Sequence, residues 1–114
     1  MNGLAYFEIP SNDLEKADRF YSQLFGWKCE LSGDKYLMFS NPDGPDGGFA
    51  KGMEIHTKGI NIYIEVENLA QTIEKAVELG GKCLKPKTEI SPDNGYYAFI
   101  EDLEGNKIGL WGKA

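Results

Sequence analysis

Apolar and other residues alternate along two short segments of the chain, residues 4–10 and 60–66. A period of two is typical of a strand that buries one face. The positions expected on the buried faces are Ala5, Phe7, Ile9, Ile60, Ile62, Ile64 and Val66. The opposite faces then carry polar or aromatic side chains, which are Tyr6, Glu8, Asn61, Tyr63 and Glu65.

Each of these strands precedes a segment with the apolar spacing of a helix. Asn12 with Glu15, and Asn68 with Gln71, have the spacing of a capping box, in which two side chains satisfy free backbone donors at a helix start. Glycines are expected to end the two helices, at Gly26 and Gly80. The apolar stripes comprise Leu14, Ala17, Phe20, Leu24, Leu69, Ile73, Ala76 and Val77. A sheet is the natural partner for such stripes.

The same order of signals occurs twice, at a period of about 55 to 61 residues. After each helix the pattern predicts about three strands, with polar turns ending in glycine at 41–44 and 102–105. Alternation assigns Leu37, Phe39, Ala98 and Ile100 to the helix side of the middle strands. The other side receives Tyr36, Met38, Tyr97, Phe99 and Glu101, and in the last strands Gly48, Ala50, Gly109 and Trp111. Each half therefore reads as βαβββ.

Composition narrows the range of partners. The chain has 114 residues and a net charge of −6, which suits one globular unit and disfavours nucleic acid or anionic membranes. No apolar run is long enough to cross a bilayer, and the first ten residues lack the pattern of a secretory signal. We therefore expect a cytoplasmic protein with a small-molecule partner. Cys29 and Cys83, at matching positions in the two halves, are expected to be reduced and semi-buried.

Three stretches resemble the vicinal-oxygen-chelate superfamily of glyoxalase I, bleomycin-resistance proteins and extradiol dioxygenases. They are YFEIPSNDLEKADRFYSQLFGWK, PDGPDGGFAKG and DLEGNKIGLW. The resemblance implies an α+β fold in one domain over residues 1–114, with two βαβββ modules forming a curved, cup-shaped, mainly antiparallel sheet. The helices would lie outside and a ligand inside. Module one would span about 3–52, the linker about 53–59 and module two about 60–113, and the family habit suggests a homodimer.

The family's metal positions bear directly on function. Metal-using members place one ligand on the first and last strand of each module, and the matching positions here are Tyr6, Gly48, Asn61 and Gly109. His, Glu or Gln would be expected, and a glycine side chain offers no donor to zinc, nickel, iron or manganese. The resemblance thus implies no usual metal cofactor. The two glycines are expected to leave the floor of the cup open to a bulky organic molecule, unless they mark a bulge or a close strand crossing.

Aromatic rings and carboxylates dominate the expected lining. The predicted ligand-binding residues are Tyr6, Glu8, Met38, Gly48, Asn61, Tyr63, Glu65, Tyr97, Phe99, Glu101, Gly109 and Trp111. Such a lining favours a flat or cationic ligand, because ring faces and carboxylates both attract cations. Ordinary packing on a sheet face is the alternative for each aromatic residue.

Two classes of function remain open. One is a metal-free binding protein, like the bleomycin-resistance members. The other is an enzyme: a divalent-metal lyase, isomerase or dioxygenase, or a metal-free isomerase in which Glu8 moves a proton from inside an apolar cup. Glu8 could equally be a solvated rim residue. The single histidine, His56, lies in the linker near Glu54, where a solvated role competes with a catalytic one.

Overall fold

The computed structural model describes residues 4–55 and 60–114. The chain divides into two compact units, Met1–Ile55 and His56–Ala114, which are called module one and module two below. His56, and with it the interpretation of the single histidine, lies outside the described residues. Within the described part of the chain, neither helix has the length and apolar character needed to span a membrane.

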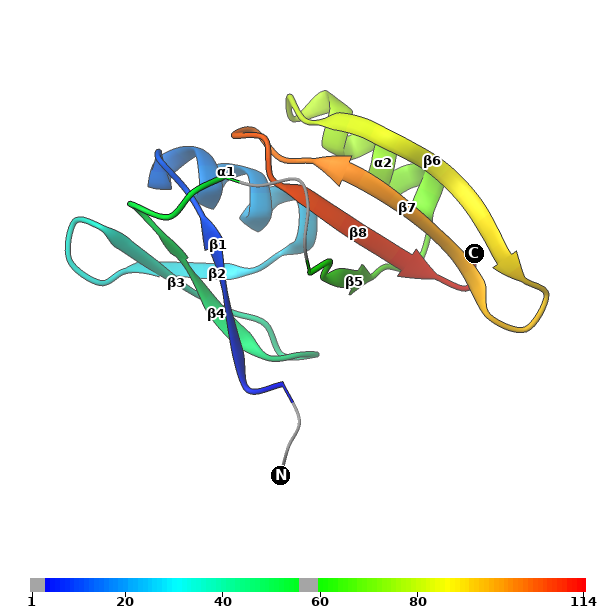
Figure 1. Ribbon diagram of the computed structural model, residues 1–114, viewed down its shortest axis with the longest axis horizontal. Helices are drawn as coiled ribbons and strands as arrows, with labels where there is room; N and C mark the ends of the chain where they lie inside the picture. Colours follow the sequence, from blue (N-terminus) through cyan, green and yellow to red (C-terminus); the bar gives the residue numbers. More distant parts are fainter. Residues whose placement is uncertain (1–3, 56–59) are drawn as a thin grey trace. The chain divides into compact units, whose positions relative to one another are not determined.

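Each module is built as a strand, a helix and three further strands, as the sequence pattern predicts (Figure 1). Module one consists of β1 (Tyr6–Pro10), α1 (Leu14–Phe25), β2 (Lys28–Leu31), β3 (Tyr36–Ser40) and β4 (Asp46–Ala50). Module two consists of β5 (Tyr63–Glu65), α2 (Leu69–Glu78), β6 (Lys82–Ser91), β7 (Gly95–Glu101) and β8 (Lys107–Gly112). The expected α+β class and the βαβββ repeat are confirmed.

The two sheets share one topology. The strand orders are β1-β4-β3-β2 and β5-β8-β7-β6, so the first strand of each module lies beside its last strand. That pairing is parallel, whereas the remaining pairs are antiparallel. In register, Glu8 pairs with Gly48 in module one, and Tyr63 pairs with Gly109 in module two. The two glycines therefore occupy equivalent positions.

The helix starts show one confirmed cap and one correction. Asn68 caps α2 as expected, because its Oδ1 accepts a hydrogen bond from the Gln71 backbone N–H at 3.0 Å. In α1 the cap is Asp13 and not Asn12: Asp13 Oδ1 accepts from the Lys16 N–H at 3.2 Å. The reason is that two adjacent residues could both cap, and Asp13 is the one with extended backbone before the first helical turn.

Aromatic rings fill the core of module one. The Trp27 and Phe39 rings stack with centroids 4.3 Å apart, and Tyr21 packs on Phe49 at 4.8 Å. Helix α1 adds the buried residues Leu14, Ala17 and Phe20 of its predicted stripe. The core side of β3 is likewise as expected, since Leu37 and Phe39 are buried. The other face of this sheet, which carries Glu8 and Gly48, is thereby directed away from α1.

Aliphatic residues fill the core of module two. Helix α2 contributes Leu69 and Ala76, and the buried strand residues are Ala98, Ile100, Ile108 and Leu110. Alternation along β7 is thus confirmed. Its opposite face carries Tyr97, Phe99 and Glu101, which are all half-buried.

Three expected core positions, Val77, Ile60 and Ala5, are exposed, and so is Cys83, which was expected to be semi-buried. Val77 is 50% exposed, because it lies about 100° around the helix from the buried Ala76. Ile60, at 89% exposed, and Ala5 both precede the strands, which begin at Tyr63 and Tyr6, so neither is paired in a sheet. Cys83 lies on the edge strand β6 and is exposed, whereas Cys29 is half-buried; both thiols are free.

Candidate functional site

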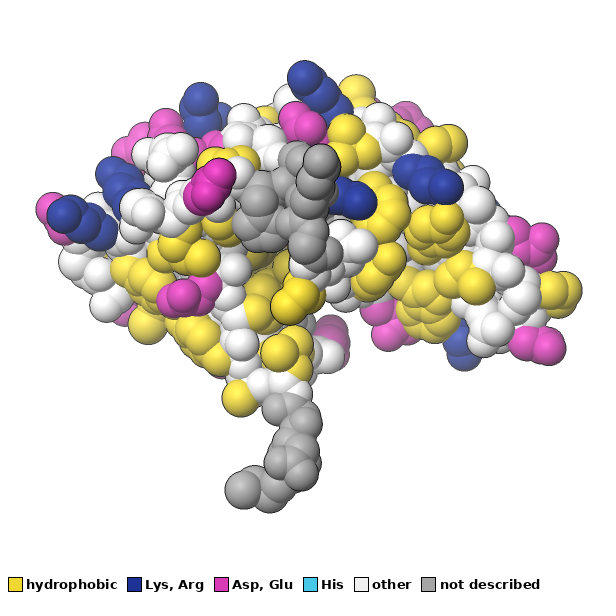
Figure 2. Space-filling model, viewed as in Figure 1, with side chains coloured by type: hydrophobic (Ala, Val, Ile, Leu, Met, Phe, Trp, Pro, Cys, Tyr) yellow, Lys and Arg dark blue, Asp and Glu magenta, His cyan; other side chains and the backbone are white. Residues whose placement is uncertain are grey.

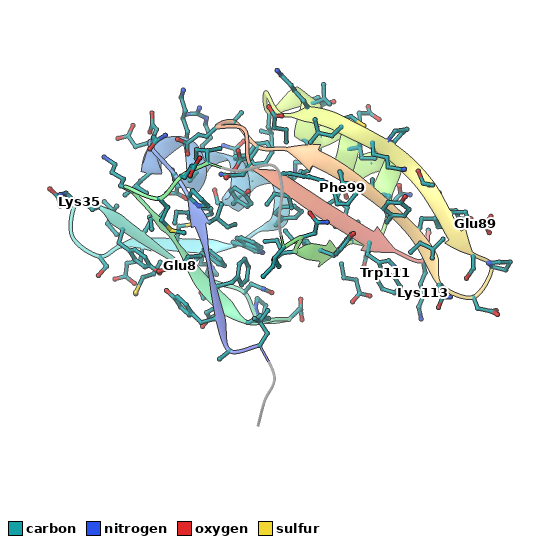
Figure 3. The ribbon with its side chains drawn as sticks, viewed as in Figure 1. Glu8, Lys35, Glu89, Phe99, Trp111 and Lys113 are labelled. Atoms are coloured by element: carbon teal, nitrogen blue, oxygen red, sulfur yellow. The ribbon has the colours of Figure 1, made fainter. Side chains whose placement is uncertain are left out.

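On the face of module one that is turned away from α1, three side chains form a hydrogen-bonded chain. The phenol of Tyr36 donates to Glu8 Oε2 at 2.8 Å, and the hydroxyls of Tyr6 and Tyr36 lie 2.7 Å apart. We call Tyr6, Glu8 and Tyr36 the Tyr36 cluster. Glu8 is labelled in Figure 3, on strand β1. Because β4 lies between β1 and β3, the Tyr36 side chain must cross one strand to reach its partners.

Gly48 makes this crossing feasible. A Cβ at Gly48 would overlap with Oη, Cζ and Cε2 of Tyr36, so the ring lies directly on the glycine. In module two, a Cβ at Gly109 would stand 2.8 Å from Cε2 of Tyr63. The expectation that these glycines leave an open floor is therefore wrong. Each glycine is covered by a tyrosine of its own module, an arrangement in which an aromatic ring shields a strand glycine.

Sequence reasoning placed Tyr36 on this face and gave it no role. The face assignment follows from alternation, but the contact with Glu8 depends on a strand order that a single sequence does not show. The signal that was present is the pairing of a long aromatic residue with a strand glycine. Met38, opposite Gly48 in the register and 43% exposed, completes this part of the predicted lining.

The phenol of Tyr36 stays protonated well into the alkaline range. Burial raises the pKa of Tyr36 above its ordinary value, and the hydrogen bonds with Tyr6 and Glu8 raise it further. Tyr36 therefore remains a donor to Glu8 at any physiological pH.

Module two carries a hollow of about 340 Å³ on the face of its sheet that is turned away from α2. Its lining is Tyr63, Ile90, Tyr97 and Trp111. Figure 2 shows hydrophobic side chains gathered over the region of β7 and β8. Three of the predicted ligand-binding residues thus meet at one place, from three different strands. Ile90 was not predicted, because the register shifts in β6 interrupt the alternation that would have revealed it.

The rings of this hollow are held by specific contacts. Trp111 Nε1 donates to the backbone oxygen of Asn94 at 2.8 Å, which fixes the indole plane. Phe99 adjoins the hollow and contacts both Tyr63 and Tyr97, with ring centroids 5.6 and 5.8 Å away. The labels in Figure 3 place Phe99 on β7 and Trp111 on β8. A flat molecule could stack in such a frame.

Two lysines already occupy ring faces beside the hollow. Lys85 Nζ lies 5.3 Å from the Tyr97 centroid, and Lys107 Nζ lies 4.1 Å from that of Phe99. These intramolecular cation–π contacts take up part of the attraction that a cationic ligand would need. Three further predicted residues, Asn61, Glu65 and Glu101, belong to module two and lie outside the described lining of the hollow.

The residue types at Tyr6, Gly48, Asn61 and Gly109, which the family resemblance implies as metal positions, are poor ligands for a metal ion. Gly48 and Gly109 contribute no side-chain donor, which leaves only the phenol of Tyr6 and the amide of Asn61. Over residues 4–55 and 60–114, no three side chains of the His, Cys, Asp and Glu types are grouped so that they could hold an ion. The donor chemistry is thus unlike that of zinc, iron or manganese centres.

Cys29 is not an activated nucleophile. Burial, together with the charge of Asp18 and its hydrogen bond, raises the pKa of the Cys29 thiol to about 12. The reactive thiolate is therefore scarce at neutral pH.

Comparison with known proteins assigns the class. Residues 3–110 match the model of the Glyoxalase/Bleomycin resistance protein/Dioxygenase superfamily, and the chain belongs to this superfamily. A "Glyoxylase-like domain-containing protein" from Didymella fabae is 37% identical over 108 residues, which cover 87% of this chain and 84% of that protein. The expected resemblance is confirmed.

Solved structures agree at the level of the fold. A glyoxalase/bleomycin resistance protein/dioxygenase family enzyme from Burkholderia phytofirmans has a TM-score of 0.80 at 16% identity, covering 96% of this chain and 98% of the other. A variant of the fosfomycin resistance protein FosX from Listeria monocytogenes also has a TM-score of 0.80, at 19% identity, covering 97% and 90%. That FosX structure is complexed with Mn(II) and 1S,2S-dihydroxypropylphosphonic acid.

Proposed function

We propose that this chain is a binding protein that holds a small planar organic molecule in the aromatic hollow of module two, without a divalent metal at the family's ligand positions. The observation that carries the proposal is the lining of the hollow by Tyr63, Ile90, Tyr97 and Trp111. Its volume of about 340 Å³ is in the range of small-molecule sites.

The chemistry of the lining favours a flat ligand. The four lining side chains include no carboxylate, ammonium, guanidinium or imidazole group, so shape and stacking supply most of the recognition. The hydrogen bond from Trp111 to Asn94 keeps the indole in one orientation, which lowers the entropy cost of binding. The lysines on the rings of Tyr97 and Phe99 favour a ligand that is uncharged where it meets this hollow.

The donor set supports independence from metal. The FosX variant is complexed with Mn(II) in its crystal structure. In this chain, two of the four positions that the family resemblance implies as metal ligands, Gly48 and Gly109, are glycine. The alternative of a metal-free isomerase that uses Glu8 finds less support. Glu8 is exposed and does not stand inside an apolar cup, and one of its oxygens already accepts the Tyr36 hydroxyl.

Thermal unfolding with a planar probe tests the proposal. We expect naphthol to raise the unfolding temperature, measured by calorimetry, because a ligand bound only by the folded state stabilises that state. At ten times the dissociation constant the gain is about 1.4 kcal/mol, or several degrees for a domain of this size. Its saturated analogue decalol, which is not flat, should give a much smaller shift.

Neighbouring tyrosines provide the matched variants. Tyr97→Leu should abolish the naphthol shift, because Tyr97 lines the hollow. Tyr96→Leu should keep it, because Tyr96 alternates to the other face of β7 and lies beneath Lys87. Equal shifts with naphthol and decalol, or an unaltered shift in Tyr97→Leu, would contradict the proposal.

Two further expectations from the sequence belong to the same proposal. We propose a homodimer and a cytoplasmic location, on the basis of the family resemblance and the two free thiols. Light scattering on the purified chain measures the first directly, and a monomer at all working concentrations would refute it.

A further inference from the structure

The hydrogen-bond directions within the Tyr36 cluster follow from a proton count. A tyrosine hydroxyl carries one proton, and Tyr36 donates its own to Glu8 Oε2. The 2.7 Å contact between the two hydroxyls must then use the proton of Tyr6. The hydrogen bonds therefore run from Tyr6 to Tyr36 and from Tyr36 to Glu8, and both phenolic protons are already donated.

The cluster therefore offers only hydrogen-bond acceptors to an incoming molecule. The remaining groups are the lone pairs of the Tyr6 oxygen and the second carboxylate oxygen of Glu8, with one formal negative charge. Both residues are accessible, since Tyr6 is 45% exposed and Glu8 is exposed. Among the described residues, the hydrogen bond of this carboxylate is with the Tyr36 hydroxyl. A ligand group with N–H donors and positive charge is the complement of such a surface.

The surroundings of the cluster are organised around this chain of contacts. The Tyr36 ring lies over Gly48, where any side chain would displace it from Glu8. In the family pattern the position of Gly48 belongs to a metal ligand, and here its missing side chain lets a phenol pass instead. Tyr6 and Met38 lie on the same face of the sheet as Glu8 and are both exposed, so they add apolar surface to this face. A cation attached to an organic body could use both features.

We propose that the Tyr36 cluster is a binding site for a protonated nitrogen group of a small organic molecule, of the ammonium, amidinium or guanidinium class. The N–H groups would donate to the free oxygen of Glu8 and to the oxygen of Tyr6. The inference concerns module one alone, and it holds or fails independently of the hollow in module two.

Three probes of one shape test the required charge. Benzamidine carries an amidinium, benzamide is its neutral counterpart and benzoate is the anion. Backbone amide shifts of the isotope-labelled full chain, measured by nuclear magnetic resonance, give both the site and the dissociation constant. We expect benzamidine to perturb residues 6–10, 36–40 and 46–50 and to bind at least about tenfold more tightly than benzamide, as for a hydrogen bond to a charged group. Benzoate should bind most weakly.

Variants then separate the contributions within the cluster. Glu8→Gln should reduce benzamidine affinity to the level of benzamide, because it removes the charge and keeps the shape. The control Glu74→Gln removes the same charge from an exposed position on α2 and should leave the affinity unchanged. Gly48→Ala should also weaken benzamidine, because the added methyl displaces the Tyr36 phenol. The amide spectrum of each variant reports whether its fold is preserved.

The outcomes divide clearly. Equal binding of benzamidine and benzamide, or full benzamidine affinity in Glu8→Gln, would overturn the inference. So would binding confined to β7 and β8, a result that leaves the planar site of module two standing. Mn(II) that perturbs the cluster when benzamidine does not would also refute it, because a metal site would then occupy this face.

Discussion

At the scale of single residues, Tyr36 is the group of the candidate sites whose pKa is raised. Its pKa is raised because burial penalises the charged phenolate, and because the hydrogen bonds with Tyr6 and Glu8 and the nearby Glu8 carboxylate also favour the neutral phenol. A tyrosine in the unfolded chain loses its hydroxyl proton at about pH 10, whereas Tyr36 in the folded chain keeps its proton at that pH. The folded state then binds more protons than the unfolded state above that pH.

The sign of the resulting pH dependence follows directly. The stability contributed by Tyr36 is fully present below about pH 10 and is lost as the pH rises towards the raised pKa. We predict that urea unfolding of the natural chain shows a steeper loss of stability between about pH 9 and pH 11 than Tyr36→Phe does. Equal slopes for the two proteins would show that Tyr36 ionises normally.

Residue-level prediction succeeded where alternation decides and failed where a side chain crosses a strand. The core positions Leu37, Phe39, Ala98 and Ile100 follow from period two alone, and all are buried. The contact of Tyr36 with Glu8 joins residues two strands apart, over a position that has no side chain. The period of the sequence does not show which strands are neighbours, so it cannot predict a contact across a strand. The ligand-binding roles of the remaining residues stay predictions.

At the scale of elements, the two last strands carry their glycines for the same physical reason. Gly48 lies beneath Tyr36, and Gly109 lies beneath Tyr63. The covering tyrosines differ in origin, since Tyr36 comes from the antiparallel neighbour β3 and Tyr63 from the parallel neighbour β5. The repeat of the sequence therefore preserves the glycine while the ring that covers it changes.

A double-mutant cycle measures this contact in module two. We predict that Gly109→Ala destabilises the protein by about 1 to 3 kcal/mol, because the added carbon overlaps with the Tyr63 ring in a packed sheet. In a Tyr63→Ala background the same change should cost less by at least about 0.5 kcal/mol. Denaturant unfolding of the four proteins gives these values. Additive effects would mean that the ring does not set the penalty.

Element boundaries were less predictable than element order. The starts of β1 and β5 fall later than the apolar pattern suggests, which leaves Ala5 and Ile60 exposed. Strand β6 was the hardest to interpret, because three register shifts break its alternation. Ile90, which lines the hollow, was missed for that reason.

At the scale of the whole molecule, the order of signals along the chain was sufficient to define the fold. Both βαβββ modules and the superfamily were predicted from repeated patterns and three stretches of sequence, and both are confirmed. The assignment of the four metal positions rests on residue identity and on the family resemblance, and it stays a prediction. Contacts that depend on strand order needed the structure.

Metal content is the property of the whole chain that these positions predict. We expect protein purified without chelators to contain far less than one equivalent of manganese, zinc, iron or nickel, because two of the four positions offer no donor. Added Mn(II) should leave the unfolding temperature unchanged. Mass spectrometry of the dissolved metal content and calorimetry check the two statements. A stoichiometric ion would refute the assignment of these four positions.

The position of the Tyr36 ring on Gly48 also constrains how this protein could be converted into a metal enzyme. Any carboxylate or imidazole introduced at residue 48 would first collide with the phenol, so that change is disfavoured until the tyrosine has been made smaller. Reducing the tyrosine first would break the chain of contacts to Glu8 before any ligand had been added. Either substitution alone would therefore disrupt the contact between Tyr36 and Glu8. A metal ligand at residue 48 requires that residues 36 and 48 are changed together.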